Sequence, residues 1–181
     1  MINLVPIASV PASSVEQLLD LAFGTDRHGR TAYRLREGMR AIPALSFAAV
    51  DADGDLLGSI QCWPIEIATP SGEVEPLILV GPVAVRPDRQ RDGLGRKLVE
   101  AALEVADRSG AEPMMLIGDS DYYGRFFGFM ADATAGWQVP GPVDRDRLLV
   151  RLHPGQQVMA EGLLRPRSLA ARTDDRQLRP V

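Results

Sequence analysis

Residues 80–98 read Val-Gly-Pro-Val-Ala-Val-Arg-Pro-Asp-Arg-Gln-Arg-Asp-Gly-Leu-Gly-Arg-Lys-Leu, and this segment has the clearest structural pattern of the sequence. Its first part is a β-type run that stops at Pro87, and a turn with Gly93 and Gly95 then opens directly into a helix. Apolar residues at helical spacing predict that this helix spans Leu94–Ser109, and a glycine follows it. A strand, a glycine turn and a helix therefore follow one another without a long loop.

The start of this helix is predicted to be an anion site. The first turn of a helix has N–H groups without internal partners and carries a partial positive charge. Gly93 and Gly95 allow a phosphate group to come close to the backbone. Arg91, Arg96 and Lys97, which is the only lysine of the chain, add positive charge at the same point. This combination favours a pyrophosphate as the ligand.

Two other phosphate-binding motifs do not fit the segment. A P-loop requires Ser or Thr directly after its lysine, whereas Leu98 follows Lys97 here. The dinucleotide-binding fingerprint requires a small residue where Leu98 stands, and an acidic residue after the next strand. The β-runs before the segment also read as hairpins rather than as part of a β-α-β unit. Both motifs are therefore rejected.

The remaining elements are predicted from periodicity and turn signals. Asp53-Gly54 and Pro70-Ser71-Gly72 separate β-type runs, which indicates an antiparallel meander ahead of residues 80–98. The predicted strands are Ile2–Ala8, two runs within Leu45–Ile67, Pro76–Val85, Met114–Ile117 and a last strand at Leu148–Leu152, and the further helices begin at Pro11–Ser14, span Ala32–Arg40 and lie near Asp121–Phe127. Residues 164–181 are polar and rich in arginine, so we expect a poorly ordered tail there.

The composition is that of an ordinary globular protein. The 181 residues, 45% of them hydrophobic and 24% charged, suffice for one buried core and are few for two. A formal charge of -4 argues against a general nucleic-acid-binding protein. Cys62 is the only cysteine, and His28 and His153 are the only histidines, so neither an internal disulfide nor a metal site is predicted. Since no apolar segment could span a membrane and no basic leader is present, we expect a cytoplasmic protein without nucleic-acid or membrane partners.

The pattern Gln90-x-x-Gly93-x-Gly95 after a β-run resembles the pyrophosphate loop of GNAT acetyltransferases, which reads Gln or Arg, two residues, Gly, one residue, and Gly or Ala. Residues 79–85 (Leu-Val-Gly-Pro-Val-Ala-Val) and 116–129 (Leu-Ile-Gly-Asp-Ser-Asp-Tyr-Tyr-Gly-Arg-Phe-Phe-Gly-Phe) resemble a bacterial branch of predicted N-acetyltransferases in that superfamily. The resemblance is most specific between these limits. It extends over about residues 1–163, and we expect a GNAT domain there.

The resemblance implies a mixed α/β (α+β) fold, in which helices flank a central sheet of six to seven mostly antiparallel strands. The strands at Val80–Val85 and Met114–Ile117 would be parallel and joined by the Leu94–Ser109 helix. It also implies acetyl-CoA as the cosubstrate and no metal. The strand before the loop would hold the pantetheine arm, and the loop with the helix start would hold the pyrophosphate. The residues to which these contacts are assigned are Val83, Ala84, Val85, Gln90, Arg91, Asp92, Gly93, Leu94, Gly95, Arg96 and Lys97.

The resemblance further implies a catalytic tyrosine on the helix after the fifth strand, which protonates the leaving thiolate. Tyr122 and Tyr123 lie in that region. However, Gly124 stands four residues before Gly128, at the position where the family has its tyrosine. Both tyrosines are therefore candidates, with a preference for Tyr123.

No general base is assigned from the sequence. Asp119 and Asp121 lie at the end of a predicted strand, where an acceptor could approach, although Ser120 or Asp121 could equally cap the next helix. Glu66, one of three glutamates beside a hairpin turn, is expected to be solvated. His28 lies in a polar loop that can border the acceptor pocket in related proteins, and a surface position is the simpler interpretation.

The function implied by the resemblance is transfer of the acetyl group of acetyl-CoA to a primary amine of a small molecule, by direct attack in a ternary complex. Two alternatives stay open. One is a non-catalytic GNAT-like module that binds an acyl-CoA as a sensor or partner, and the other is acetylation of protein N-termini or lysines. The expected partner is a small-molecule amine, and the protein would be a monomer or a homodimer.

Overall fold

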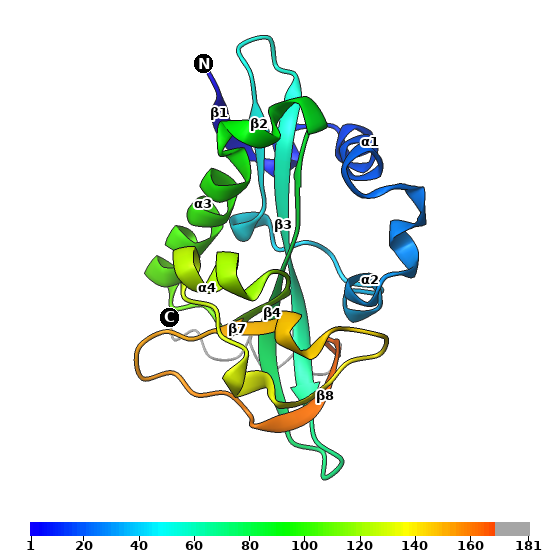
Figure 1. Cartoon of the computed structure of the whole chain (residues 1–181), viewed down its shortest axis with the longest axis vertical. Helices are drawn as coiled ribbons and strands as arrows, with labels where there is room; N and C mark the ends of the chain where they lie inside the picture. The colour runs from blue at the N-terminus through cyan, green and yellow to red at the C-terminus, as the bar shows by residue number, and fades with distance from the viewer. Residues whose placement is uncertain (169–181) are drawn as a thin grey trace, which may run out of the picture.

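The hairpin of β3 (Leu56–Ala68) and β4 (Val74–Val85) is the centre of the structure, a computed structural model that describes residues 1–168 (Figure 1). The two strands pair antiparallel along almost their whole length, with a shift of register between Ile60 and Cys62. Both were predicted from their β-type runs. The two longest helices pack against this hairpin, so its two faces determine where they lie.

Six further strands complete one mixed sheet, whose main order is β1-β2-β3-β4-β5-β7. Within residues 1–168 only the β4–β5 and β6–β8 pairs are parallel, so the predicted mostly antiparallel α/β fold is confirmed. The sheet has eight strands rather than the six or seven expected. The strands outside the central hairpin are β1 (Asn3–Pro6), β2 (Phe47–Val50), β5 (Met114–Ile117), β6 (Gly136–Gln138), β7 (Leu148–Arg151) and β8 (Glu161–Pro166).

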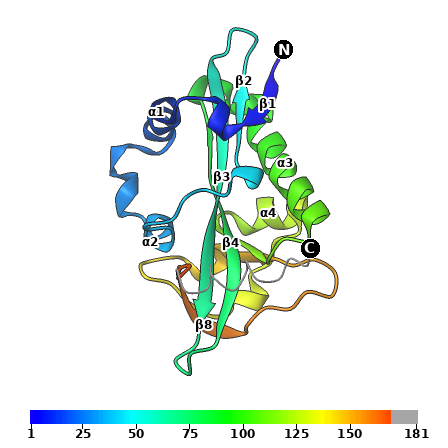
Figure 2. The same ribbon diagram turned by 180° about the vertical axis from the view of Figure 1, so that it is seen from behind.

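Helices lie on both sides of the hairpin. Figures 1 and 2 show α3 and α4 on one side of it and α1 and α2 on the other. None of the helices within residues 1–168 is long and apolar enough to cross a membrane. The α-helices are α1 (Ala12–Phe23), α2 (Thr31–Leu35), α3 (Leu94–Ser109) and α4 (Ser120–Phe127). Short 3-10 helices are Ile7–Ser9, Thr25–Gly29, Pro43–Leu45, Pro87–Asp92, Asp132–Thr134 and Arg145–Arg147.

The bounds of α3 are those predicted, whereas α2 ends at Leu35 instead of Arg40. In α3 a long apolar periodicity fixes the helix from end to end. Arg36 and the residues after it form a turn that includes Gly38 with a φ of 72°. That backbone conformation favours glycine and ends a helix.

Side chains at the end of β4 alternate between the two faces of the sheet and so contact both helical layers. Val83 and Val85 pack against the core beneath α3, while Ala84 between them is buried with residues of α1. Successive side chains of a strand point to opposite faces, so the end of β4 contributes to both cores at once. The end of β4 is thereby held between α3 and α1.

The C-terminal part of the described chain corrects two expectations. Leu148–Leu152 was expected to be the last strand, yet β8 follows it and pairs with both β3 and β6. The expected domain boundary at residue 163 falls inside β8, and the rest of the expected tail, 169–181, lies outside the described residues. Gly162 explains why no strand pattern was visible, because a Cβ there would come within 2.7 Å of the Ile67 side chain. A glycine is required at this close approach, although glycine is otherwise unfavourable in strands.

Glu66 is buried, contrary to the expectation that it is solvated. It lies on β3 with no exposed surface, and its Oε1 accepts a hydrogen bond from Arg165 Nε at 2.7 Å. Its Oε2 accepts a hydrogen bond from the Ser168 backbone N–H at 3.2 Å. A buried carboxylate of this kind depends on such partners. β8 is therefore bound to the sheet by an ion pair as well as by strand pairing, and Ser168 after it by a hydrogen bond.

We predict that Arg165→Met lowers the free energy of unfolding by about 2 kcal/mol, because it leaves the buried Glu66 carboxylate without its cationic partner. Urea denaturation of the wild type and of Arg165→Met measures this difference in the free energy of unfolding. The matched control is Arg108→Met, which removes an arginine that is 70% exposed and should change stability by less than about 0.5 kcal/mol. Equal effects of the two substitutions would contradict a structural role for the Glu66–Arg165 pair.

Candidate active site

Strands β4 and β5 separate soon after they meet. Their parallel pairing consists of Ile78 with Met114 and Leu79 with Met115. Beyond these residues β4 stays paired with β3 as far as Val85, and β5 stays paired with β7 as far as Ile117. The two strands thus diverge and leave facing edges that no strand covers within residues 1–168. Backbone groups along such edges need other hydrogen-bond partners, which a bound ligand can provide.

The N-terminus of α3 lies beside this opening. Gly93 precedes the helix with a φ of 70°, and no side chain among the described residues caps the first turn. A Cβ on Gly95 would lie 3.7 Å from Val85 and 3.9 Å from Val83, so the helix start is next to the end of β4. The first turn of α3 therefore places N–H groups without internal partners and two glycines beside the opening, and the binding of an anion there stays a prediction.

The charged residues of the predicted loop differ in their contacts. Gln90, Arg91 and Asp92 belong to the 3-10 helix before α3, and Asp92 is paired with Arg89 at 3.2 Å. Arg96 is paired with Glu100 at 2.8 Å and its guanidinium lies 4.7 Å from the centre of the Phe126 ring. Arg91 and Lys97 are exposed and have no ion pair within residues 1–168. These two cations are the ones most available to an anion.

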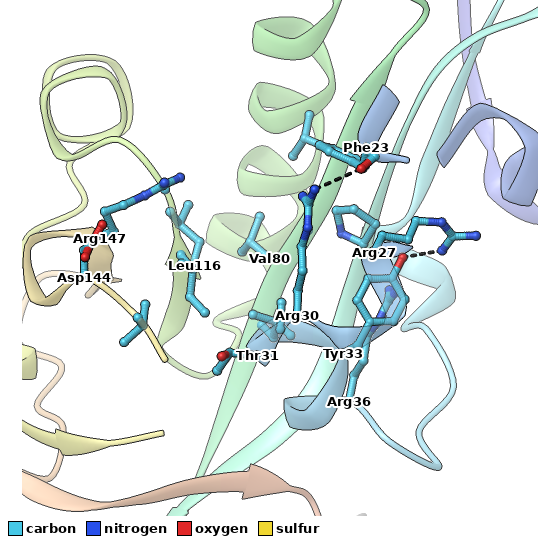
Figure 3. A pocket seen from close by; sticks show the side chains of 18 of the residues that line it. Phe23, Arg27, Arg30, Thr31, Tyr33, Arg36, Val80, Leu116, Asp144 and Arg147 are labelled. Carbon is cyan, nitrogen blue, oxygen red and sulfur yellow. Dashed lines mark hydrogen bonds between the residues drawn. The ribbon is translucent and has the colours of Figure 1, made fainter. Parts of the chain in front are cut away.

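A cavity of about 1050 Å³ continues from the opening. Its walls come from the end of α1, the segment around α2, β4, the end of β5 with the start of α4, and the loop before β7. Figure 3 shows Asp144 and Arg147 on one side of the cavity and Arg30, Tyr33 and Arg36 on the other. The lining residues are Phe23, Arg27, Gly29, Arg30, Thr31, Ala32, Tyr33, Arg36, Leu79, Val80, Gly81, Pro82, Val83, Leu116, Ile117, Gly118, Asp119, Tyr123, Pro142, Val143, Asp144 and Arg147.

The two candidate tyrosines have different environments. Tyr123 lines the cavity, whereas Tyr122 does not line it and is 36% exposed. Their rings meet edge to face at 5.0 Å within a cluster that also contains Phe127 and Phe129. Burial raises the pKa of the Tyr123 phenol above its usual value, so this hydroxyl stays protonated at neutral pH.

Gly118 makes room for the Tyr123 ring. A Cβ at residue 118 would stand only 2.7 Å from Tyr123 Cε2, a separation that side-chain carbons do not adopt. The glycine directly after β5 therefore allows the Tyr123 ring to lie against the end of the strand. Sequence spacing could not reveal this, because it depends on a contact between β5 and α4.

The acidic candidates also differ in their position relative to the cavity. Asp119 caps α4, since its Oδ1 accepts a hydrogen bond from the Tyr122 N–H at 3.0 Å, and it lines the cavity. The capping role that was expected for Ser120 or Asp121 thus belongs to Asp119. Asp121 does not line the cavity, whereas Asp144, which sequence reasoning missed, does.

A buried arginine holds the α2 wall of the cavity. Arg27 is 2% exposed, and it donates hydrogen bonds to Asp20 at 2.9 Å, to Glu16 and to the Tyr33 hydroxyl. These contacts fix the segment before α2 against α1. His28 lies beside them with its ring 4.9 Å from that of Tyr33, and it does not line the cavity. No group of three or more histidine, cysteine or acidic residues within residues 1–168 could hold a metal ion.

Comparison with known proteins adds family information to this geometry. Residues 13–129 match the model of the acetyltransferase (GNAT) family. The N-acetyltransferase YhbS of Escherichia coli K12 is 26% identical over 117 residues, which are 65% of this chain and 67% of the relative. The N-acetyltransferase YjhQ of the same organism is 28% identical over 137 residues, which are 75% of this chain and 74% of the relative.

Two solved structures have the same fold. The crystal structure of Escherichia coli YhbS in complex with CoA superposes with a TM-score of 0.70 at 24% identity, and the match covers 92% of this chain and 89% of that one. A GNAT family acetyltransferase from Brucella melitensis in complex with acetyl-CoA has a TM-score of 0.63 at 26% identity, over 93% of this chain and 97% of that one. The likeness extends well beyond the matched family segment.

The environment of Tyr123 predicts a tyrosine that ionises above the usual pKa of about 10. Because the pKa is raised on folding, the protonated phenol stabilises the folded protein below the usual tyrosine pKa. This contribution is lost as the pH rises through the raised pKa of Tyr123. Ultraviolet absorbance of tyrosinate, followed during alkaline titration, should show a late component that is absent in Tyr123→Phe and present in Tyr122→Phe. A late component that survives in Tyr123→Phe would contradict the assignment.

Proposed function

The chain belongs to the acetyltransferase (GNAT) family, and from this premise we propose that it transfers the acetyl group of acetyl-CoA to a primary amine of a small molecule. One observation carries the proposal. The opening between β4 and β5, the N-terminus of α3 and the cavity with Tyr123 meet at Val83, which lines the cavity and would lie 3.9 Å from a Cβ on Gly95. A donor with a phosphate-bearing end and a reactive end would be held at α3 and in the cavity respectively.

The residues around the opening suit acetyl-CoA. The first turn of α3, with Gly93 and Gly95, would bind the pyrophosphate, and Arg91 and Lys97 would add their free charges. The backbone from Val83 to Val85 would pair with the pantetheine arm along the uncovered edge of β4. Acetyl-CoA would supply an acetyl group that is activated as a thioester.

The residues of the cavity suit acyl transfer to an amine. The reaction requires a deprotonated amine, a polarised carbonyl and a proton for the sulfur as its bond to the acetyl carbon breaks. A backbone N–H between Val83 and Val85 would donate to the carbonyl oxygen, and the Tyr123 hydroxyl would donate the proton to sulfur. Asp119 and Asp144 are the carboxylates in the cavity wall that can accept a proton from the amine, directly or through water.

The shape of the cavity favours a small acceptor over a protein segment. Its volume of about 1050 Å³ is in the range of sites for small ligands. The Thr31 hydroxyl donates to Pro142 O at 2.7 Å, and Arg34 donates to Pro140 O at 2.7 Å. These bonds join the α2 wall to the loop before β7, so the cavity is closed on that side rather than open as a groove.

The first test of the proposal is Gly95→Asp, which is expected to weaken acetyl-CoA binding at least about tenfold without destabilising the fold. A carboxylate in the first turn stabilises a helix but repels a pyrophosphate held there. A Cβ at Gly95 meets only ordinary van der Waals contacts, so the protein can accommodate it. Calorimetric titration with acetyl-CoA and CoA measures the affinity.

The matched control for this experiment is Ser13→Asp, which places the same charge at the second residue of α1, as Gly95→Asp does in α3. It should leave the affinity for acetyl-CoA unchanged. If Gly95→Asp, like the Ser13→Asp control, binds acetyl-CoA as tightly as the wild type does, the pyrophosphate is not held at α3. Absence of binding to the folded wild type would reject the function itself.

The second test is Tyr123→Phe, which is expected to lower kcat about 100-fold or more while the affinity for acetyl-CoA changes little, because only the proton for the leaving sulfur is lost. Release of free thiol with a panel of primary amines measures kcat, and Tyr122→Phe should retain most of the activity. Ionisation of Tyr123 should lower wild-type activity only above the usual tyrosine pKa of about 10, because burial raises the pKa of its phenol. Tight acetyl-CoA binding without turnover of any amine would instead support a non-catalytic acyl-CoA-binding module.

A further inference from the structure

Arg36 is a buried cation held between two aromatic rings. It is 8% exposed, and its guanidinium carbon lies 3.9 Å from the centre of the Tyr33 ring and 4.2 Å from that of Trp63. Within residues 1–168 no carboxylate lies within ion-pair distance of it, and its Nη1 makes no hydrogen bond. Trp63 Nε1, in one of the two rings, is also buried without a partner. Two buried donors without partners, on side chains that stack on each other, indicate that an acceptor group belongs beside them.

The neighbouring Arg27 is a buried arginine with a structural role, and its hydrogen-bond partners differ from those of Arg36. Arg27 is equally enclosed, yet Glu16, Asp20 and the Tyr33 hydroxyl take up its donors. Arg36 stacks on two aromatic rings, which favour the cation, but its Nη1 has no hydrogen-bond partner. Burial accordingly holds the pKa of Arg36 below its usual value. An uncompensated buried charge is costly, and a binding role explains its presence.

The position of Arg36 connects it to the acceptor. It lines the large cavity, and with Trp63 it also lines an adjoining hollow of about 400 Å³. The cavity wall contains four arginines and two aspartates. Apart from Arg27, these arginines have no carboxylate partner within residues 1–168, and Arg30 uses one nitrogen to donate to Phe23 O at 2.9 Å. Figure 3 shows Arg30 and Arg36 on the α2 side, opposite Arg147.

We propose that the acceptor carries an anionic group, a carboxylate or a phosphate, in addition to its amine, and that Arg36 recognises this group. The inference rests on the proposed function, because it names the class of acceptor. The planar guanidinium presents paired donors that match either anion, and Trp63 Nε1 adds a donor beside it. Arg36 is thus a specificity-determining residue rather than a catalytic one.

The experiment compares matched amines that differ only in the anionic group. The CoA complex of the full chain is titrated by calorimetry with 4-aminobutyrate against butylamine, and with O-phosphoethanolamine against ethanolamine. At least one anionic amine is expected to bind about tenfold more tightly than its neutral counterpart, a difference of about 1.4 kcal/mol. The pair that shows the preference distinguishes a carboxylate from a phosphate.

The variant Arg36→Met should abolish this preference, while Arg36→Lys should retain part of it through charge alone. Methionine fits between aromatic rings and removes an unpaired buried charge, so the melting temperature of Arg36→Met should not fall. The control Arg108→Met removes an exposed charge from the end of α3 and should keep the full preference.

The possible failures are distinguishable. If neither anionic amine binds the CoA complex more tightly than its counterpart, or if Arg36→Met keeps the preference, the inference is wrong while the acetyltransferase proposal stands. A fall in melting temperature with the preference unchanged would give Arg36 a purely structural role. Failure of the wild type to bind CoA would reject the proposed function first.

Discussion

The early end of pairing between β4 and β5 creates the opening around which the helices and the cavity are arranged. Two residue pairs, ending at Leu79 and Met115, join the strands, and each strand is then held by a different neighbour. Pro82 lies in the diverging part of β4 and has no N–H with which to restore the pairing. A sheet interrupted in this way exposes backbone groups at the centre of the molecule, where only a ligand or water can bind them.

The helices keep this opening in a fixed shape. α3 buries Leu94 and Leu98 in its first two turns, and the burial of each such side chain contributes about 2 kcal/mol. The start of α3 is therefore anchored at the point where its free N–H groups are needed, although no side chain within residues 1–168 caps it. On the other face, α1 packs against Ala84, so the end of β4 cannot move toward either layer. Rigid packing around an unsatisfied edge is what a preorganised site requires.

The sequence predicted the elements that local patterns determine, and it missed the features that depend on contacts between residues distant in the chain. The bounds of α3 and β5 were predicted correctly, because their apolar patterns are long or clearly delimited. β8 was missed, because Gly162 replaces a side chain where the backbone of β3 comes close. Residue spacing left two tyrosines open, and burial against Gly118 distinguishes Tyr123 from its neighbour. The environment of Arg36 was not predictable, since Trp63 is distant in sequence and a single arginine has no local pattern that signals burial.

The charges around the cavity also bear on the state of the amine. Positive charge near an amine lowers its pKa, because it disfavours the ammonium form. An acceptor whose anionic group is bound at Arg36 would have its amine among Arg30, Arg147 and the two aspartates, and its anion would offset the charge of the arginine that binds it. The field that remains is set by Arg30 and Arg147, the other two arginines without a carboxylate partner within residues 1–168, against Asp119 and Asp144. Because Asp119 already accepts a hydrogen bond from α4, the balance depends most on the distance of the amine from Asp144, which both attracts an ammonium ion and can take its proton.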